Sequence, residues 1–454
     1  MSQSTESQSP PGLTDHIKEA KKVLEQNRVG SFTKPAANLY PYQWSWDSAF
    51  IAIGYAHYAQ HQAEKELLHL FRSQWQNGLV PQIVFANEVK KGTYFPGPDF
   101  WQTEDVEAAP DSPRTSGICQ PPIHATAVMH VLKYGDDYER AKRFAAEIFP
   151  KLKAWHEFLH RERDPENEGL VYIRHPWGSG QDNSPIWDAV LQNLEISPEQ
   201  VPPYSRKDTD LIHIDERPSD DDYDKYVYLL DFFRQRKYDE ERIRKDGCPF
   251  LIQDVLFNSL LCKADRDLAE IANAIGEKSK PFTEQADRTA RTINDKLWDD
   301  EHDMYLDFDL NEKQRVRADV LSGFIPMFAE IPGQDRANRM FNYLNTHCFC
   351  RLDDDCLAAP SYDRSGPGYS ASKYWRGPIW INMNWMLSEG LQAYGNKEYV
   401  TLIRNSIAKL TLKNGFCEYF NPESGEGHGS DCFSWTSSLL IDIATRYDVE
   451  TLED

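Results

Sequence analysis

Hydrophobic residues recur along most of this chain at the three- and four-residue spacing of helices. In residues 138–161, apolar side chains follow one another at intervals of four, four, three and four from Phe144 to Leu159, which makes one face of a helix. Pro150 is expected to kink this stretch or to start a second helix. The same spacing predicts further helices over residues 14–28, 47–59, 62–76, 122–134, 186–198, 222–236, 251–275, 283–298, 317–329, 334–346, 377–393, 397–412 and 433–447.

Strand patterns are scarce by comparison. The clearest is residues 304–310, where apolar residues alternate after an acidic turn over residues 299–303. Helices joined as sequential antiparallel pairs can build either a solenoid or a closed ring of hairpins. No self-similar repeat of about 33 to 45 residues is visible, which counts against a solenoid. The pattern therefore predicts an all-α ring with a concave face where a small ligand can bind.

Two segments, residues 85–120 and 199–221, are rich in Gly, Pro and Asp and show no helical spacing. They are long for connections inside a compact domain, so we expect lid or binding loops. Residues 1–12 are polar and are expected to form a disordered tail without an apolar signal core. The remainder, residues 13–454, is expected to be one catalytic domain.

The amino-acid composition indicates which kinds of molecule this protein can bind. The formal net charge is −22, which disfavours nucleic acid, and an anionic substrate would need a local basic group. No apolar run is long enough to span a membrane, so we expect no membrane association and a cytoplasmic protein. Aromatic residues make up 12% of the chain, and Trp and Tyr often line sugar sites. Oligomeric state stays open, with a homo-oligomer as one option.

Eight cysteines in 454 residues do not suggest a disulfide framework. The tightest cluster contains His347, Cys348, Cys350 and Cys356. It lacks paired C-x-x-C spacing, so reduced structural thiols are favoured over a metal site. No metal and no organic cofactor are expected.

Five short stretches combine stacking surfaces with hydrogen-bonding groups at the edges of predicted helices. Such a pattern is expected of a sugar pocket assembled from several loops. The stretches are residues 40–48 (YPYQWSWDS), 115–122 (TSGICQPP), 177–185 (WGSGQDNSP), 374–382 (YWRGPIWIN) and 418–422 (EYFNP).

Two of these stretches contain the carboxylates that glycosidic cleavage needs, one acid and one base or nucleophile. Asp182 follows two glycines and could approach a scissile oxygen, but Asp in such a loop is also a common helix N-cap. Glu418 lies among apolar neighbours that could raise its pKa, although an exposed loop Glu is the alternative. Asp47 could cap a helix, bind sugar hydroxyls, or do both. Taken singly, each tryptophan in these loops is more simply a core residue.

Residues 374–380 (YWRGPIW) resemble a motif of the α/α-barrel hydrolases of glycoside hydrolase families 37 and 63. Together with residues 42–48 (YQWSWDS), 179–185 (SGQDNSP) and 418–422 (EYFNP), they resemble family 63 more narrowly. Within that family the chain is most similar to the compact branch that hydrolyses mannosylglycerate and glucosylglycerate. The motifs occur in the family's order, and the resemblance covers about residues 30–445.

The resemblance implies an (α/α)6 barrel with inserted lid loops and a few short strands. It also implies an inverting mechanism with Asp182 as general acid and Glu418 as general base, whose carboxyls should stand roughly 6.5–9.5 Å apart. The residues that it implies for the sugar pocket are Tyr40, Trp44, Trp46, Asp47, Gln120, Trp177, Gly180, Tyr374, Trp375 and Trp380.

For the acidic aglycone, the resemblance points to Arg217 and Tyr223 in one loop and to Tyr94 in the other. A bidentate Arg–carboxylate pair would offset the adverse net charge. The alternative for Arg217 is a surface ion pair with adjacent acids. The processing glucosidases of family 63 carry a β-rich domain before the barrel that this chain has no room for, so glycan trimming is not expected.

The leading expectation is therefore hydrolysis of a small α-glycoside with an acidic aglycone, mannosylglycerate or glucosylglycerate. A trehalase-like or short-oligosaccharide α-glucosidase is the nearest enzymatic alternative. A sugar isomerase or epimerase would need bases such as His beside an open-chain carbonyl, and only His428 lies near a motif. A non-catalytic sugar-binding protein is the last alternative, and the two carboxylates argue against it.

Overall fold

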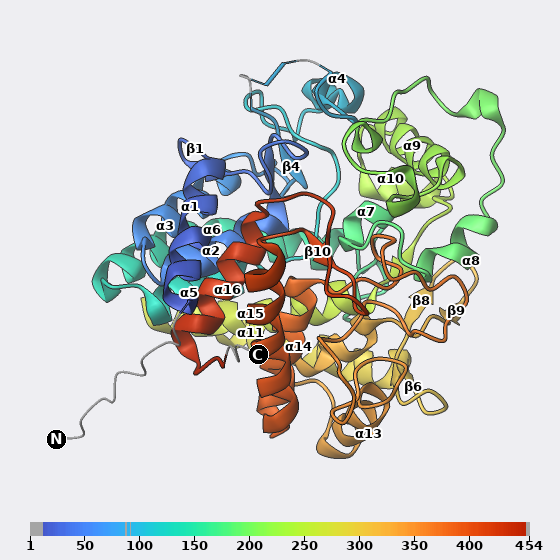
Figure 1. The fold of residues 1–454 in the computed structure, drawn as a ribbon. Coiled ribbons are helices and arrows are strands. Elements are labelled where there is room, and N and C mark those ends of the chain that lie inside the picture. Colours follow the sequence, from blue (N-terminus) through green and yellow to red (C-terminus); the bar gives the residue numbers. More distant parts are fainter. Residues whose placement is uncertain (1–11, 87–88, 91, 451–454) are drawn as a thin grey trace.

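The computed structural model describes residues 12–86, 89–90 and 92–450, and helices dominate it (Figure 1). Residues 1–11 of the expected tail lie outside the described part. The longer helices are α1 (Leu13–Asn27), α2 (Ser45–Ala56), α3 (Gln60–Arg72), α5 (His124–Tyr134), α6 (Tyr138–Glu162), α9 (Asp220–Gln235), α11 (Val255–Ile275), α12 (Lys280–Thr292), α13 (Gln334–Leu344), α14 (Ile381–Ala393), α15 (Lys397–Asn414) and α16 (Ser434–Arg446).

Six elements form a closed inner ring. Going around it, α2 packs on α5, α5 on α11, α11 on the 3-10 helix η6 (Leu321–Met327), η6 on α14, α14 on α16, and α16 on α2. The helices α1, α3, α6, α12, α13 and α15 alternate with them along the chain and lie outside. The first and last helices of the chain therefore lie side by side (Figure 1). This is the predicted (α/α)6 barrel, with η6 in one inner position.

Burial separates the inner elements from the outer ones. All residues of α2 are buried, whereas α12 buries only one stripe, Phe282, Ala286, Thr289 and Ala290. An inner element is covered on every side, so it can be apolar all round, and an outer helix keeps one polar face in water. The ring thus leaves only its two ends for a polar site.

Short helices and loops join the ring elements at one end. Between α6 and α11 the chain leaves the ring through α7 (Pro176–Ser179), α8 (Ile186–Gln192), α9 and α10 (Glu240–Lys245), which lie at the upper right of Figure 1. The 85–120 loop contains α4 (Pro98–Trp101) and a 3-10 turn, and the 199–221 loop contains further 3-10 turns. The last two residues of the second loop already belong to α9.

The strands are two or three residues long and pair antiparallel. They are β1 (Arg28–Val29) with β2 (Phe32–Thr33), β3 (Gln43–Trp44) with β4 (Ile83–Val84), β6 (Trp298–Asp299) with β7 (Met304–Tyr305), β10 (Tyr419–Phe420) with β11 (Gly427–His428), and the sheet β5 (Ile252–Gln253), β8 (Asp307–Asp309) and β9 (Gln314–Val316). The expected single strand over 304–310 is therefore two strands, β7 and β8, in different sheets.

The helix α6 continues through Pro150, so of the two expected effects of this proline the start of a second helix is wrong; its buried apolar face outweighs the lost hydrogen bond. Two helix predictions differ more from the structure. The stretch 317–329 yields only the 3-10 helix η6, which contains Pro326. The stretch 186–198 yields only the short helix α8.

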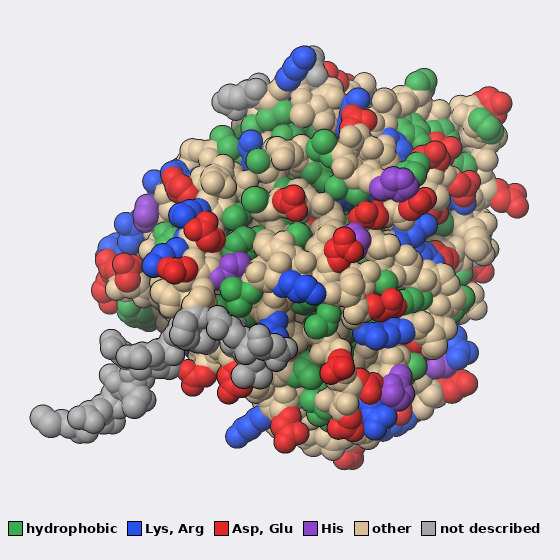
Figure 2. All heavy atoms as spheres, in the orientation of Figure 1, with side chains coloured by type: hydrophobic (Ala, Val, Ile, Leu, Met, Phe, Trp, Pro, Cys, Tyr) green, Lys and Arg blue, Asp and Glu red, His purple; other side chains and the backbone are tan. Residues whose placement is uncertain are grey.

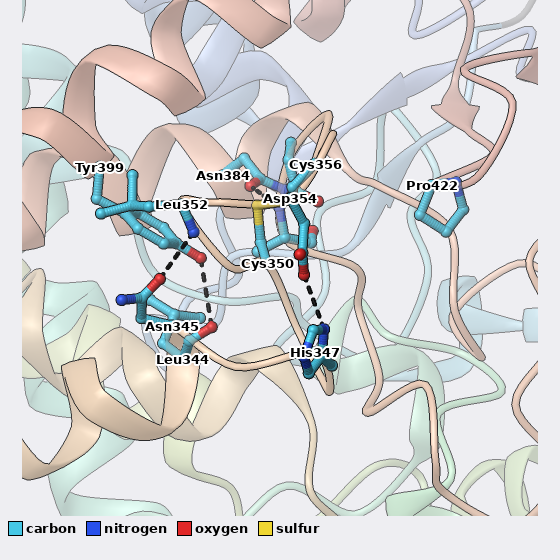
Figure 3. The surroundings of a disulfide bond; sticks show 12 residues. Leu344, Asn345, His347, Cys350, Leu352, Asp354, Cys356, Asn384, Tyr399 and Pro422 are labelled. Carbon is cyan, nitrogen blue, oxygen red and sulfur yellow. Dashed lines mark hydrogen bonds and ion pairs between the residues drawn. A yellow bond between two sulfur atoms is a disulfide. The ribbon is translucent and has the colours of Figure 1, made fainter.

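The cysteine cluster also differs from expectation. Cys350 and Cys356 form a disulfide, with their Cα atoms 5.5 Å apart across a tight turn (Figure 3). The expectation of reduced thiols is therefore wrong for this pair, because cysteine spacing alone does not reveal the turn that joins them. His347 pairs with Asp354 beside the disulfide. Among the described residues, no group of three or more His, Cys, Asp or Glu side chains could hold a metal ion.

The surface is mixed in charge. Figure 2 shows Asp and Glu side chains scattered among Lys and Arg over the face drawn. In the part of the chain that the structure describes, no helix has the length and apolar character needed to cross a membrane.

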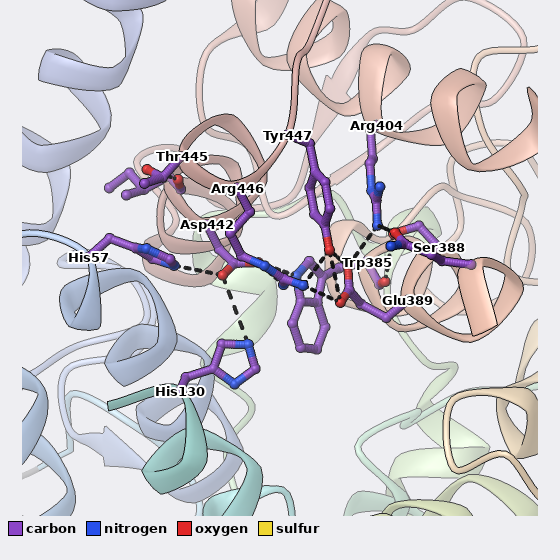
Figure 4. A network of polar contacts seen from close by, with 12 residues as sticks. His57, His130, Trp385, Ser388, Glu389, Arg404, Asp442, Thr445, Arg446 and Tyr447 are labelled. Atoms are coloured by element: carbon purple, nitrogen blue, oxygen red, sulfur yellow. Dashed lines mark hydrogen bonds and ion pairs between the residues drawn. The ribbon is translucent and has the colours of Figure 1, made fainter. Parts of the chain in front are cut away.

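Asp442 of α16 ties the inner helices together at the end of the ring where α2 finishes (Figure 4). Its carboxylate accepts hydrogen bonds from His57 (2.7 Å) just after α2, from Trp385 Nε1 of α14 (2.8 Å) and from Arg446 Nη1 (3.0 Å). Burial alone would raise the pKa of Asp442, but the His57 hydrogen bond and the Arg446 charge hold it below its ordinary range. The buried carboxylate is thus fully ionised in the folded chain.

We expect Asp442→Asn to lower the free energy of unfolding by about 3 kcal/mol near neutral pH, because a buried charge network loses its centre. Since the folded pKa is depressed, this contribution is present above the unfolded pKa of about 4 and shrinks as the pH falls below it. Urea unfolding of both proteins at neutral and acid pH measures the effect. Asp15→Asn, in an exposed pair with Lys18, is the control, and an equal effect of the two substitutions would contradict the role of Asp442.

Candidate active site

A small cavity opens at the end of the ring where the inner helices begin. Its walls come from residues just before or within the first turns of α2, α14 and α16, and from the loops between helices. Helix N-termini carry unpaired backbone N–H groups and the positive end of the helix dipole, so this end of the ring suits groups rich in oxygen. The cavity volume available to water is about 80 Å³.

Fourteen of the fifteen residues named from the sequence line this one cavity, although they come from distant parts of the chain. They are Tyr40, Trp44, Trp46, Asp47, Tyr94, Gln120, Trp177, Gly180, Asp182, Arg217, Tyr223, Tyr374, Trp375 and Glu418. The exception is Trp380, which stacks on the back of Trp375 with ring centroids 3.8 Å apart and donates its indole hydrogen to the Tyr374 carbonyl (2.9 Å). Trp380 therefore supports the wall.

Glu418 is buried and receives several hydrogen bonds. Tyr40 Oη donates to Oε1 (2.8 Å), the Ser430 backbone N–H donates to Oε2 (3.0 Å), and Arg217 Nη2 lies 3.5 Å from Oε2. Burial raises the pKa of Glu418, and Arg217, Tyr40 and Ser430 each act against that rise. These donors favour the ionised form of Glu418, which is the form that can accept a proton from another group.

Asp182 has a different environment. Within the part of the chain that the structure describes, no side chain donates a hydrogen bond to its carboxyl. Burial raises the pKa of Asp182 to about 7; the Arg217 charge lowers it, while Glu418 and Asp208 raise it. The carboxyl caps neither neighbouring helix, since α8 has Pro185 at its N-cap. Asp182 is therefore suited to remain protonated while Glu418 is ionised, the division expected of an acid and a base.

At two glycines the backbone approaches side chains of the cavity wall closely. Gly429 has φ +72°, and a Cβ there would lie 2.5 Å from Glu418 Oε2. Gly180 has φ +76°, and a Cβ there would lie 2.6 Å from the Trp46 ring. Only glycine adopts these conformations without strain while leaving the space free. The backbone can thus pass directly beside the Glu418 carboxylate and the Trp46 ring.

Asp47 is the third carboxyl in the wall. It lies in the first turn of α2, whose N-cap is Trp44, so Asp47 is not the N-cap residue of that helix. Burial raises its pKa well above the ordinary value, and the charges of Glu418 and Asp182 raise it further. Asp47 therefore tends to carry a proton and can both donate and accept hydrogen bonds inside the cavity.

Arg217 faces the cavity. Its guanidinium stacks over the Tyr374 ring, 4.4 Å from the centroid, and Nη1 donates to Tyr40 Oη (3.2 Å). Its Nε is buried without a hydrogen-bond partner among the described residues. The alternative of a surface ion pair is thus wrong, because the loop turns this side chain inward.

The two long loops both contribute residues to the cavity wall and contact each other. Phe95 of the first loop stacks on Tyr204 of the second (5.4 Å), and Tyr204 stacks on Tyr223 at the start of α9 (5.5 Å). The Arg206 guanidinium also lies over the Tyr223 ring, 4.4 Å from its centroid, and pairs with Asp208. Tyr94 therefore reaches the cavity from the first loop and Tyr223 from the start of α9, where the second loop packs against it.

Several polar groups of the wall have no hydrogen-bond partner among the described residues. They include Trp375 Nε1, Trp435 Nε1 and Gln82 Oε1, all buried. Unpaired buried polar groups cost free energy unless a ligand satisfies them. A ligand with several hydroxyl groups could accept hydrogen bonds from the two indole N–H groups and donate one to the Gln82 oxygen.

Sequence reasoning missed eight lining residues: Pro35, Leu39, Gln82, Phe95, Asp208, Pro218, Phe433 and Trp435. Phe433 and Trp435 flank the start of α16 as Trp44 and Trp46 flank the start of α2, and this parallel was a usable signal. Gln82 and Asp208 stand in no distinctive pattern. Conversely, Arg376 of the 374–380 motif does not line the cavity and pairs with Asp188 through two hydrogen bonds (2.7 and 2.6 Å).

Comparison with known proteins identifies relatives over nearly the whole chain. A family described as the mannosylglycerate hydrolase MGH1-like glycoside hydrolase domain matches residues 40–436. A mannosylglycerate hydrolase of Rubrobacter radiotolerans is 48% identical over 95% of this chain and 97% of its own length. A glucosylglycerate hydrolase of Mycolicibacterium hassiacum is 34% identical over 92% of this chain and 95% of its own length.

A solved structure agrees in fold. The family 63 mannosylglycerate hydrolase of Thermus thermophilus, in complex with Tris and D-glycerate, superposes with a TM-score of 0.87 at 39% identity, covering 95% of this chain and all of that one. The resemblance found in the motifs and the barrel expected from it are confirmed. The chain belongs to the mannosylglycerate hydrolase MGH1-like group of glycoside hydrolases, within family 63.

Proposed function

We propose that this enzyme hydrolyses mannosylglycerate or glucosylglycerate with inversion at the anomeric carbon. The observation that carries the proposal is one cavity with two carboxyls in unlike environments: Asp182 has no side-chain donor within the described part of the chain, and Glu418 has several donors. The names of the relatives support the substrate class.

In the proposed reaction, Asp182 donates its proton to the glycosidic oxygen as the bond to the anomeric carbon breaks. Glu418 takes a proton from a water molecule whose oxygen attacks the opposite face of that carbon. Glycerate leaves with the proton from Asp182, and the sugar acquires the water hydroxyl in inverted configuration. Proton exchange with solvent then restores Asp182 and Glu418.

For the sugar, we propose that the tryptophan and tyrosine rings of the wall form the stacking faces. Unpaired groups such as Trp375 Nε1 would hydrogen-bond its hydroxyls, as would the Asp47 carboxyl. The residues proposed for this subsite are Tyr40, Trp44, Trp46, Asp47, Gln120, Trp177, Gly180, Tyr374 and Trp375, with Trp380 supporting them from behind.

For glycerate, we propose that Arg217 binds the carboxylate, assisted by Tyr94 and Tyr223. Its unpartnered Nε and its position in the wall support this role, as does the need for a local cation in a chain of net charge −22. We further propose that residues 13–454 form one catalytic domain, with the 85–120 and 199–221 loops as lids.

Rates on mannosylglycerate, glucosylglycerate and trehalose test the proposed substrate class. We expect turnover of at least one glycerate glycoside, and Arg217→Ala should raise its KM about tenfold to a hundredfold by removing a charged hydrogen bond. A neutral aryl α-glycoside of the same sugar is the control and should keep its KM. Strong trehalose hydrolysis with no action on the glycerate glycosides would overturn the proposal.

The acid and base roles predict different defects. Asp182→Asn and Glu418→Gln should each lower kcat on the natural substrate about 10³-fold. A dinitrophenyl glycoside needs no proton on its leaving group, so Asp182→Asn should hydrolyse it nearly normally while Glu418→Gln stays inactive. Equal losses of both variants on both substrates would refute the separate roles, and unchanged circular dichroism would show that the variants fold.

The pKa of Asp182 predicts the alkaline limb of the pH profile. Because the acid must be protonated, kcat/KM should fall as the pH rises through about 7. The Asp208 charge raises the pKa of Asp182, so Asp208→Asn should move this limb to lower pH. A limb that stays in place in Asp208→Asn would show that another group controls it.

A further inference from the structure

Two adjacent residues of the 199–221 loop meet two adjacent residues at the β10–β11 hairpin. Arg217 lies beside Glu418, and the Glu216 carboxylate accepts a hydrogen bond from the Tyr419 hydroxyl (3.2 Å). The same Glu216 oxygen lies 3.4 Å from Nδ1 of His428. Two adjacent residues of the loop, Glu216 and Arg217, thus contact the hairpin segment that contains the proposed base Glu418.

The hairpin presents both partners of Glu216 together. Tyr419 and His428 are cross-strand neighbours in the β10–β11 register, and their rings stack with an interplanar angle of 12°. The Tyr419 hydroxyl donates to the Glu216 oxygen, and Nδ1 of His428 lies close to that same oxygen. Regular strand pairing therefore brings both side chains to one carboxylate oxygen.

These three side chains lie outside the cavity. None of Glu216, Tyr419 and His428 belongs to its lining, so none can touch the reacting atoms in this arrangement. Arg217, directly after Glu216, is in the lining and is buried. Any influence of Glu216 on the reaction must therefore pass through the position of the loop, and above all through Arg217.

The cavity is too small for the proposed substrate while the loops lie in this position. About 80 Å³ is far below the roughly 300 Å³ at which ligand pockets usually begin, so the closed loops leave too little room for a sugar joined to an acid. Substrate must enter with the loops moved aside, and Arg217 must then return to its place. The contacts between the 199–221 loop and the hairpin determine what fraction of molecules has Arg217 back in the cavity wall.

We propose that Glu216 is a positioning residue, whose carboxylate docks the 199–221 loop on Tyr419 and His428 and thereby places the Arg217 guanidinium in the cavity wall. This inference rests on the proposed function, because it assigns Arg217 to the substrate carboxylate. The Glu216–His428 pair is largely shielded, with side chains 23% and 15% exposed. By contrast, the neighbouring Asp215–His213 pair is 86% and 71% exposed and supplies a matched control.

Steady-state kinetics on the glycerate glycoside give the first test. Glu216→Ala should raise KM about tenfold with a smaller change in kcat, since it removes both contacts of the loop. Glu216→Gln should have a smaller effect, because it keeps an acceptor for the Tyr419 hydroxyl. Asp215→Ala and the neutral aryl glycoside should show unchanged KM. A purely structural role would lower the fraction of active enzyme and leave KM unchanged, which would overturn the proposal.

Hydrogen–deuterium exchange of the free protein gives a second, substrate-independent test. Amides of residues 208–218 should exchange faster in Glu216→Ala and in His428→Ala than in wild type or Asp215→Ala, because the loop loses its anchor. Equal exchange in all four proteins would overturn the docking role. If wild type fails to hydrolyse either glycerate glycoside, the proposed function falls, while the exchange experiment still decides whether Glu216 fastens the loop.

Discussion

Glu418 carries a carboxylate that is almost completely removed from water, and distant parts of the chain must meet to keep it ionised. Tyr40, 378 residues earlier in the sequence, donates one hydrogen bond, and Arg217, 201 residues earlier, supplies the nearby charge. The backbone of Ser430 donates from the far side of the hairpin. A buried charge without such partners would cost several kcal/mol. The helical ring closes by packing α16 on α2, and this packing brings Tyr40, which precedes α2, next to Glu418, which precedes α16.

The same arrangement gives Asp182 and Glu418, the proposed acid and base, different surroundings. Burial raises the pKa of Asp182, which has no side-chain donor among the described residues, and the Glu418 charge raises it further, while the Arg217 charge lowers the pKa of both carboxyls. Two similar side chains thus lie in unlike surroundings. Because Arg217 belongs to the 199–221 loop, the pKa values of both carboxyls depend on where that loop lies.

The periodicity of apolar residues was enough to predict most helices, since inner and outer helices both need buried faces. The motifs and the resemblance that they carry gathered fourteen of the residues that line the cavity, and eight further lining residues were missed. Periodicity failed where local chemistry decides: Pro326 lies in a 3-10 helix, and a turn joins Cys350 to Cys356. It also could not show that Trp380 lies behind Trp375, or that Asp208 faces the cavity, because such facts depend on packing between distant segments.

We propose that Asp182 and Glu418 act as a separate acid and base on either side of one glycosidic bond, with water as the nucleophile. Proton NMR of the first sugar released from the α-linked glycerate glycoside tests it most directly. Single inversion predicts that the β-anomer accumulates first and then mutarotates. Initial release of the α-anomer would mean that the configuration is retained, and would contradict the assignment of Glu418 as a base.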